Sequence, residues 1–371
     1  MEGFLISSRG FLLQLQMIII IMRSAILRGC VMKRWLMVFA LIVAGPSGGP
    51  LMAAEQVNLY SARKESLIKP LLERFTAETG IEVNLVTGKA AALQKRLEVE
   101  GRNTPADLLL TSDAGRLYLA KRAGLFQAVE SKVLVQAIPA HLRDGENQWF
   151  GLSKRARIIV HSKRRVKPGE LSRYEDLTDS RWKGRICIRS SGNIYNQSLL
   201  ASMVAHFGEP AAERWAAGVV ANLARPPRGN DRAQIKAVAL GECDVAVVNS
   251  YYLGKMQNAR DPAERAAAAQ VVPLFPNQAD RGTHVNISGA GVIRHARNRE
   301  NAVKLLEFLV SDEAQRWYAA SNHEYPVKSG IPVSETVAAW GYPFKEDGLD
   351  MGELGRHNVA AVKIFDRVGW R

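Results

Sequence analysis

Three tyrosines stand where apolar segments of this 371-residue chain end. Tyr251 and Tyr252 follow closely on the apolar run Val245–Val248, which indicates a buried strand. Tyr195 ends the segment Ile186–Tyr195 in a similar way. In open α/β sheets, ligands bind in the crevice outside the carboxyl ends of the strands. Three phenols there can supply three hard, anionic oxygens, the kind of ligand that a highly charged cation such as ferric iron prefers.

A tyrosine pair also has a simpler interpretation, namely two half-buried rings with satisfied hydroxyls. Adjacent residues on an extended strand point to opposite faces, so Tyr251 and Tyr252 can reach one metal ion only if the backbone leaves strand geometry before them. Asn249 and Ser250 favour such a turn. Isolated histidines more often have structural roles, but four are conceivable further ligands: His161, His206, His284 and His323.

Two cysteines, Cys187 and Cys243, lie within a few residues of the strands that deliver the tyrosines. In an exported protein a cysteine pair is more typical of a disulfide than of a metal site or a catalytic thiol. The hypothesis is therefore that Cys187 and Cys243 form a bridge behind the site.

The part of the chain that begins near residue 55 alternates strands and helices. Short apolar strands are expected at Val57–Tyr60, Ile81–Val86 and Ala106–Leu110. Apolar residues at helical spacing follow the first strand, and further helices are expected at Ala90–Glu100 and up to Gly124. This βαβαβα order predicts a parallel sheet with helical crossovers.

A second α/β series follows, and the chain then returns to the first. The mixed strand at Trp149–His161 leads into a strand at Arg185–Arg189, and Asp231 is a plausible N-cap of the helix Asp231–Leu240. Val285–Ile293 returns as a strand before two amphipathic helices. The pattern predicts two α/β lobes with a cleft between them, joined by two crossing strands near Arg157–His161 and Val285–Ile287. The expected parts are a first lobe of residues 55–156 and 288–340, a second lobe of residues 157–287, and a helical tail, residues 341–371, packed on the lobes.

Residues 1–54 differ in composition from the rest of the chain. From Met32 to Ala54 they have a basic start, an apolar centre and small residues at the end, which is the layout of a signal peptide. The apolar centre is too short for a comfortable membrane span. We expect export, with a mature start near residue 55, and Met32 opens a sufficient signal by itself.

The formal net charge is +14, and most of the excess lies outside residues 1–54. A basic chain can bind nucleic acid, but the basic residues are scattered and no nucleic-acid motif is present, so a solvated basic surface is the favoured interpretation. The sequence also has no Ser-His-Asp order, no Gly-rich phosphate loop and no paired carboxylates at credible positions. We therefore expect neither nucleic-acid binding nor an enzyme.

Six segments together resemble the periplasmic ferric-iron-binding proteins of bacterial ABC transporters, which have the type II periplasmic binding protein fold. These segments are Leu59–Glu65 (LYSARKE), Pro105–Leu117 (PADLLLTSDAGRL), Phe150–Val160 (FGLSKRARIIV), Trp182–Gln197 (WKGRICIRSSGNIYNQ), Gly241–Tyr252 (GECDVAVVNSYY) and Asn322–Val327 (NHEYPV). The resemblance implies an α/β, two-lobed protein in the periplasm, a monomer. It would deliver ferric iron to an inner-membrane permease and its ATPase.

The resemblance implies that the phenolates of Tyr195, Tyr251 and Tyr252 are iron ligands from the second lobe. The first lobe of such proteins usually adds a histidine from the turn after the first strand. Here Lys64 stands where that histidine is common, and its ammonium group is a poor ligand at neutral pH. Glu65, where some members carry a tyrosine, is the tentative first-lobe ligand.

Binding of ferric iron by phenols has a chemical requirement, because a free phenol has a pKa of about 10. The cation must drive the protons off, so affinity should fall as the pH falls. Nearby cations can hold the phenols ionised and can bind a small anion. Water, carbonate or another small anion is expected to complete the metal sphere. The candidates for this role are Arg155 and Arg157, followed by Arg63 and Lys64. The alternative function is binding of a small anion such as a phosphonate, with the tyrosines as pocket walls.

Overall fold

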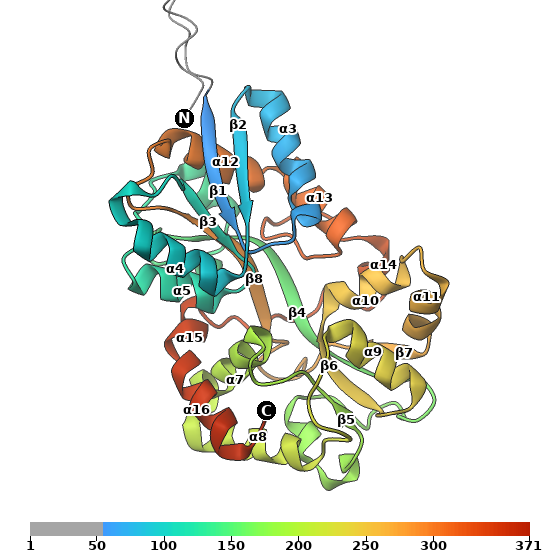
Figure 1. Ribbon diagram of the computed structural model, residues 1–371. Helices are drawn as coiled ribbons and strands as arrows, with labels where there is room; N and C mark the ends of the chain where they lie inside the picture. Colours follow the sequence, from blue (N-terminus) through green and yellow to red (C-terminus); the bar gives the residue numbers. More distant parts are fainter. Residues whose placement is uncertain (1–54) are drawn as a thin grey trace, which may run out of the picture. The chain divides into compact units, whose positions relative to one another are not determined.

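The first three strands form a parallel sheet, and each is followed by a helix. The computed structural model describes residues 55–371, so the predicted signal segment lies outside the described residues. β1 (Gln56–Ser61) pairs in parallel with both β2 (Glu82–Thr87) and β3 (Leu108–Thr111). The helices that follow them are α3 (Lys69–Thr79), α4 (Ala90–Glu100) and α5 (Ala114–Arg122) (Figure 1). The predicted βαβαβα order is confirmed.

One long strand, β4 (Phe150–Ser162), belongs to both parts of the sheet. Its first half pairs antiparallel with β8 (Val285–Val292), which also pairs with β3. Its second half pairs antiparallel with β6 (Val245–Asn249) and β7 (Val271–Leu274). The strand order is β2-β1-β3-β8-β4-β6-β5, with β7 beside β4. The predicted crossing segments therefore lie in β4 and at the start of β8.

The second α/β series consists of β5, β6 and the helices that lie between and after these strands. β5 pairs with β6 in parallel over two residues only, so the strand expected at Arg185–Arg189 is shorter than predicted. The elements of this series are β5 (Ile186–Cys187), α7 (Ile194–Phe207), α8 (Glu209–Ala221), α9 (Asp231–Leu240), α10 (Ser250–Gln257) and α11 (Pro262–Ala269).

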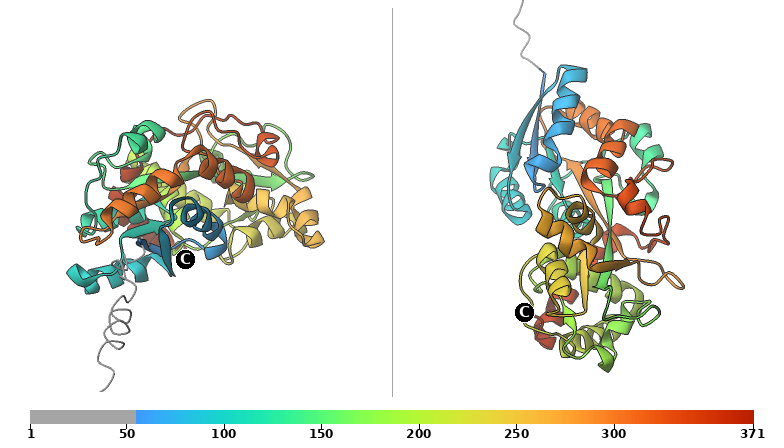
Figure 2. Two further views of the ribbon diagram at one scale, coloured as in Figure 1. Left: turned by 90° about the horizontal axis from the view of Figure 1, so that it is seen from above. Right: turned by 90° about the vertical axis from the view of Figure 1, so that its right-hand side faces the viewer.

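The C-terminal helices connect the two parts of the described chain. α15 contacts α5 and α7, and α16 contacts α7 and α8. Figure 2 shows α16 at the end of this unit opposite to β1, β2 and α3. None of the helices in residues 55–371 has the length and apolar character to cross a membrane. The remaining helices are α6 (Lys132–Ala137), α12 (Arg299–Leu309), α13 (Asp312–Asn322), α14 (Glu335–Ala338), α15 (Met351–Arg356) and α16 (Asn358–Val368), with short 3-10 turns at Glu65–Leu67, Gly101–Asn103, Ala140–Leu142, Glu175–Thr178 and Ser180–Trp182.

Two hydrophobic clusters form the core, and β6 separates them. Val245 and Val247 belong to the cluster that includes α7, α8 and α16, whereas Ala246 and Val248 belong to the larger cluster beneath β1, β3 and β8. Successive side chains of a strand point to opposite faces, so β6 is buried on both. This burial explains why its sequence is a continuous apolar run, and it fixes the point at which the two tyrosines leave the sheet.

Candidate functional site

Tyr251 and Tyr252 lie in the first turn of α10, directly after β6. The strand ends at Asn249 and the helix begins at Ser250, so the backbone leaves strand geometry at the predicted place. The two rings have centroids 4.3 Å apart and planes tilted by 32°. Consecutive residues of a helix are separated by about 100° rather than by the 180° of a strand. The two phenols therefore reach the same region of the molecule.

Tyr195 is also in the first turn of a helix, which differs from the prediction. β5 ends at Cys187, and α7 begins at Ile194. The intervening residues include Ser190-Ser191-Gly192-Asn193, whose turn-forming side chains and glycine end the strand early. All three phenols are thus at helix N-termini, where the helix dipole favours negative charge.

Three guanidinium groups surround the ring of Tyr195. The Cζ atoms of Arg155, Arg157 and Arg189 lie 5.6, 6.0 and 5.7 Å from its centroid. Arg155 and Arg157 are two residues apart on β4 and therefore share a face of the strand. Guanidinium groups at this distance make cation–π contacts with the ring. Arg189 was not expected from the sequence.

Arg155 has two nitrogen atoms without a protein partner, although it is only 2% exposed. Its Nη1 donates to Ser288 Oγ at 3.1 Å. Its Nε and Nη2 find no acceptor within residues 55–371. Buried donors are rarely left unpaired, because the lost hydrogen bonds to water are costly. The guanidinium therefore has capacity for a small anion beside Tyr195.

A buried carboxylate, Asp231, joins the other two arginines. Its Oδ1 accepts from Arg157 Nη1 at 2.7 Å and from the backbone N–H of Asn249 at 2.9 Å. Its Oδ2 accepts from Arg189 Nη1. Asp231 had been expected as a helix N-cap, but Asn230 has that position and accepts from the N–H of Ala233 at 3.1 Å.

Asn196 completes this network from α7, next to Tyr195. Its Oδ1 accepts from Arg157 Nη2 at 2.7 Å. Asn196 is as buried as Asn249, whose side-chain oxygen accepts from Arg157 Nη1 at 3.1 Å. No local pattern in the sequence indicates these contacts, since their partners are far apart along the chain.

The phenols of the pair are protonated at neutral pH in the absence of a cation. Withdrawal from water, followed by repulsion from Tyr195 and Asp231, raises the pKa of Tyr252 to about 12. Withdrawal from water, followed by repulsion from Tyr195, also raises the pKa of Tyr251 well above its usual value. Arg155 opposes the shift of Tyr251, and Arg189 opposes that of Tyr252. Tyr251 and Tyr252 are thus neutral phenols, and the neighbouring arginines favour their ionised forms.

Arg63 is buried and fully paired, so it supports the site from a distance. Its Nη2 binds Glu324 at 2.5 Å, its Nη1 donates to Ser288 Oγ at 2.7 Å, and its Nε donates to the carbonyl of Leu67 at 3.2 Å. Arg63 and Tyr251 also interact electrostatically. Because Arg155 donates to the same Ser288 oxygen, the turn after β1 is linked to the arginines of β4.

The other two residues of that turn face elsewhere. Glu65 binds Lys69 Nζ at 2.9 Å, and both side chains are about half exposed (53% and 54%). Lys64 is exposed. The Glu65–Lys69 spacing is the i, i+4 spacing that brings side chains together along a helix. The structure therefore does not bring Lys64 and Glu65 to the tyrosines, which they could reach only by a rearrangement.

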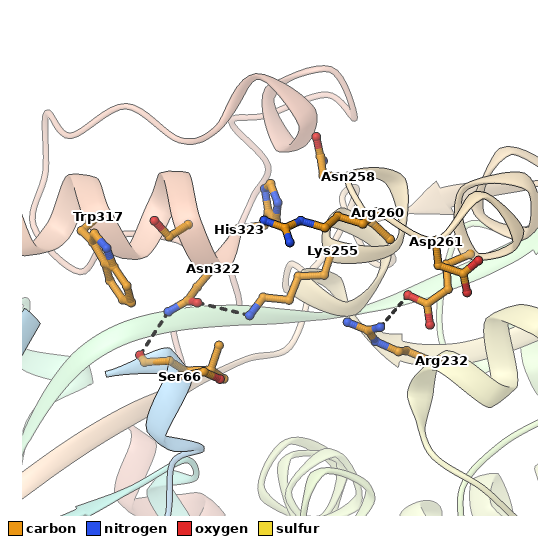
Figure 3. A pocket seen from close by; sticks show the side chains of 13 residues that line it. Ser66, Arg232, Lys255, Asn258, Arg260, Asp261, Trp317, Asn322 and His323 are labelled. Atoms are coloured by element: carbon orange, nitrogen blue, oxygen red, sulfur yellow. Dashed lines mark hydrogen bonds and ion pairs between the residues drawn. The ribbon is translucent and has the colours of Figure 1, made fainter. Parts of the chain in front are cut away.

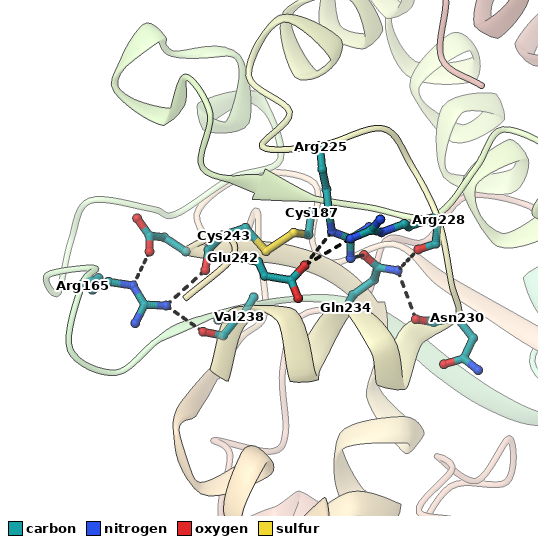
Figure 4. The surroundings of a disulfide bond; sticks show 10 residues. Arg165, Cys187, Arg225, Arg228, Asn230, Gln234, Val238, Glu242 and Cys243 are labelled. Carbon is teal, nitrogen blue, oxygen red and sulfur yellow. Dashed lines mark hydrogen bonds and ion pairs between the residues drawn. A yellow bond between two sulfur atoms is a disulfide. The ribbon is translucent and has the colours of Figure 1, made fainter. Parts of the chain in front are cut away.

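The structure joins Cys187 and Cys243 in a disulfide, with Cα atoms 5.8 Å apart. Each cysteine precedes a tyrosine by eight residues. Figure 4 shows the bridge between β5 and the turn before β6, where Arg165 donates to the carbonyls of Val238 and Cys243. The bridge and these bonds fix the strands behind the phenols.

A cavity of about 720 Å³ lies beyond the tyrosines along α10. Lys255, one turn after Tyr251, points into it and donates to Asn322 Oδ1 at 3.2 Å (Figure 3). Burial, with smaller contributions from Arg63 and Arg232, lowers the pKa of Lys255 to about 8 against the opposing effect of Glu324. Leu67 from the turn after β1 also lines this cavity. The tyrosines themselves do not line it.

Conventional metal clusters are absent from the part of the chain that the structure describes. No group of three His, Cys, Asp or Glu side chains converges in residues 55–371. Two of the histidines considered as ligands are already paired, His206 with Asp347 at 2.8 Å and His323 with Ser334 Oγ at 2.9 Å. A metal ion bound here would depend on the phenols.

Comparison with known proteins is consistent with this geometry. Residues 103–350 match the model of a family described as bacterial extracellular solute-binding protein. "Iron uptake protein A1" of Synechocystis is 50% identical over 317 residues, which cover 85% of this chain and 88% of that protein. A putative 2-aminoethylphosphonate-binding periplasmic protein of Salmonella typhimurium is 24% identical over 81% of this chain and 86% of that protein.

Solved structures of iron-binding proteins are also similar to this chain. A Trichodesmium protein in complex with iron and citrate ligands superposes with a TM-score of 0.82 at 50% identity, over 85% of this chain and 100% of that one. A ferric binding protein from Campylobacter jejuni superposes with a TM-score of 0.81 at 41% identity, over the same shares. The predicted fold, a two-lobed α/β type II periplasmic binding protein, is confirmed.

Proposed function

The chain belongs to the family of bacterial extracellular solute-binding proteins, and from that premise we propose that it captures ferric iron through tyrosine phenolates and delivers it to an ABC transporter. The single observation that carries this proposal is the cluster of Tyr195, Tyr251 and Tyr252 beside three arginines. Three phenolates would cancel the charge of a ferric ion. Iron uptake protein A1 is far more similar to this chain than the phosphonate-binding relative, at 50% against 24% identity, so the phosphonate alternative is not retained.

The open donors of Arg155 support a second component of the site, a small anion. Forked hydrogen bonds from a guanidinium suit a planar oxyanion such as carbonate. Arg155 would hold that anion beside Tyr195, and the anion would occupy a coordination position of the iron. Arg157 would act differently, since its two Nη atoms are already bound to protein oxygens.

Glu65 is the proposed ligand from the turn after β1. Its carboxylate must then leave Lys69, with which it forms a half-exposed pair. Exposed ion pairs of this kind contribute about 0–1 kcal/mol, so a trivalent cation can compete for the carboxylate. Lys64 and Arg63 would add positive charge near the cleft, although Glu324 offsets the charge of Arg63.

Closure of two lobes would bring that turn to the phenols. We place the lobes at residues 55–156 with 288–340 and at residues 157–287, with residues 341–371 as a tail that packs on both. β4, which pairs with strands of both parts, is the natural hinge element. Closure about a hinge is common among periplasmic binding proteins.

The cellular setting follows from the same proposal. The protein would be exported by a signal peptide within residues 1–54 and would work in the periplasm as a monomer. An inner-membrane permease and its ATPase would accept the iron. The role is binding and release without turnover, and nucleic acid is not a partner.

A titration with ferric citrate, followed by visible absorption, tests the proposal. We expect a broad phenolate-to-iron band that saturates at one iron per chain and weakens in Tyr195→Phe and Tyr251→Phe. Tyr342→Phe is the matched control, since Tyr342 is exposed and packs against Tyr325 and Phe344 instead of the three phenols. A colourless protein, or a band unchanged in both site variants, would refute the tyrosinate site.

A further inference from the structure

Asp231 is the one carboxylate among residues 55–371 that forms salt bridges with two of the arginines around Tyr195. Its side chain is fully buried. Arg157 Nη1 lies 2.7 Å from Oδ1, and Arg189 binds Oδ2. A carboxylate with both oxygens used in this way forms a bridge between two cations that would otherwise repel each other.

The same carboxylate reaches all three chain segments that carry the tyrosines or their cations. Arg157 comes from β4, and Arg189 follows β5 on the way to Tyr195. Asp231 also accepts a hydrogen bond from the N–H of Asn249. Asn249 is the last residue of β6 before Tyr251 and Tyr252. One buried side chain thus sets the relative positions of the phenols from α7 and α10.

The start of α9 is itself held in place, so Asp231 is a fixed group. Asn230 caps the helix, and Gln234 Nε2 donates to the carbonyls of Arg228 at 2.6 Å and Asn230 at 3.2 Å (Figure 4). The disulfide lies in the same region, between Cys187 and Cys243. A carboxylate on such a support can orient its partners without moving.

We propose that Asp231 is the internal anion of this site: it neutralises and positions Arg157 and Arg189 against Tyr195, so that Arg155 alone is left for an anion from solution. The proposal rests on the proposed function for its link to iron. The contacts support this assignment, since Arg155 forms no salt bridge with a carboxylate of residues 55–371 and keeps two open donors. Asp231 is a positioning residue, because it acts on the phenols through the arginines.

The inference is tested by chemical rescue of Asp231→Ala with formate. Partners that orient metal ligands typically change metal affinity by roughly 10–100-fold when they are removed. We expect a loss of iron affinity in that range, measured by competition with citrate, together with a changed visible band. Sodium formate should restore most of both in Asp231→Ala, and should change the unmodified protein much less, because only Arg155 is open to an anion there.

Asp113→Asn is the matched control for the loss of a buried carboxylate. Asp113 is also buried, but it accepts from Ser198, Asn286 and the N–H of Gly115 and forms no salt bridge within residues 55–371. Formate should not improve iron binding by this variant. If Asp231→Ala keeps normal iron affinity, or if formate fails to restore it, the proposal is wrong.

A second readout separates this inference from the proposal of iron binding. In the absence of iron, formate should raise the melting temperature of Asp231→Ala by more than that of the unmodified protein, in which Asp231 already occupies the position between Arg157 and Arg189. If Asp231→Ala does not fold, a double variant provides the test. Asp231→Asn with Arg189→Gln should be more stable than Asp231→Asn alone, because the double variant removes the guanidinium that has lost its carboxylate. Stabilisation by formate without any iron band would support the internal anion and refute iron binding. If Asp231→Asn alone is as stable as the double variant, the proposal that Asp231 is the internal anion is wrong.

Discussion

The three phenols obtain their chemistry from what surrounds them more than from their own residue type. A tyrosine is a weak acid, and partial burial makes the protons of Tyr251 and Tyr252 harder to remove. Arg155 opposes this effect at Tyr251, and Arg189 opposes it at Tyr252. A cation of high charge can then displace the protons, whereas a weakly charged one cannot. The balance favours selection for ferric iron.

Iron binding should release protons, because the phenols bind protons and iron in competition. The pKa of Tyr252 is raised to about 12, so its phenol is neutral at pH 7 and must lose its proton to become a ligand. We expect about three protons to leave per iron if all three phenols ionise, and the affinity to fall as the pH falls. A pH indicator in weakly buffered solution measures the release. Iron binding with no released proton would show that the phenols are not ligands.

Two helix starts, of α7 and α10, determine where the phenols point. Both helices follow short or buried strands of the second α/β series, and the Cys187–Cys243 bridge connects those strands. α10 packs closely on the segment after α13. A Cβ atom added at Gly254 would lie only 2.8 Å from His323 Cβ and 2.9 Å from His323 Cγ. Glycine is therefore required by space at this position.

Gly254→Ala should destabilise the protein by about 1–3 kcal/mol, as overpacking of a core does. The gain in helix propensity, about 1 kcal/mol, is too small to compensate. Because α10 carries Tyr251 and Tyr252, a displaced helix should also weaken the iron band. Thermal unfolding and the visible titration measure the two effects.

Gly348→Ala serves as the control for this substitution, since a Cβ atom there meets nothing within 4 Å. It should leave both the melting temperature and the band close to those of the unmodified protein. Equal behaviour of the two variants would contradict the close packing of α10 on His323.

The molecule as a whole connects two α/β parts through β4, with α15 in contact with helices of both. The turn after β1, which carries Glu65, belongs to one part, and the three phenols belong to the other. Glu65 can reach the phenols only if these parts approach each other. The iron-loaded form should therefore be more compact than the iron-free form.

Small-angle X-ray scattering can measure this closure. A compact chain of this length has a radius of gyration of roughly 20 Å, and we expect the value to fall when one iron is bound. Glu65→Ala should reduce the decrease while the band from the phenols remains. An unchanged scattering curve at full iron loading would refute closure, and the first-lobe ligand would then have to be sought elsewhere.

The sequence by itself determined the alternating strands and helices of the first part and the turn before Tyr251, and it singled out the three tyrosines as the candidate ligands. These features are local, since apolar periodicity and turn residues act within a few positions of the chain. It also placed the arginines of β4 correctly on one strand, because a spacing of two residues defines a face.

Only the tertiary structure decided how the charges are paired. Asp231 lies 74 positions from Arg157 and 42 from Arg189 along the chain, and nothing local to any of them indicates the contact. The Glu65–Lys69 pair, in contrast, follows the local i, i+4 spacing of a helix and could have been expected from the sequence. Charge pairing depends on distance in space and on burial, which the order of residues does not specify until the sheet has brought distant segments together.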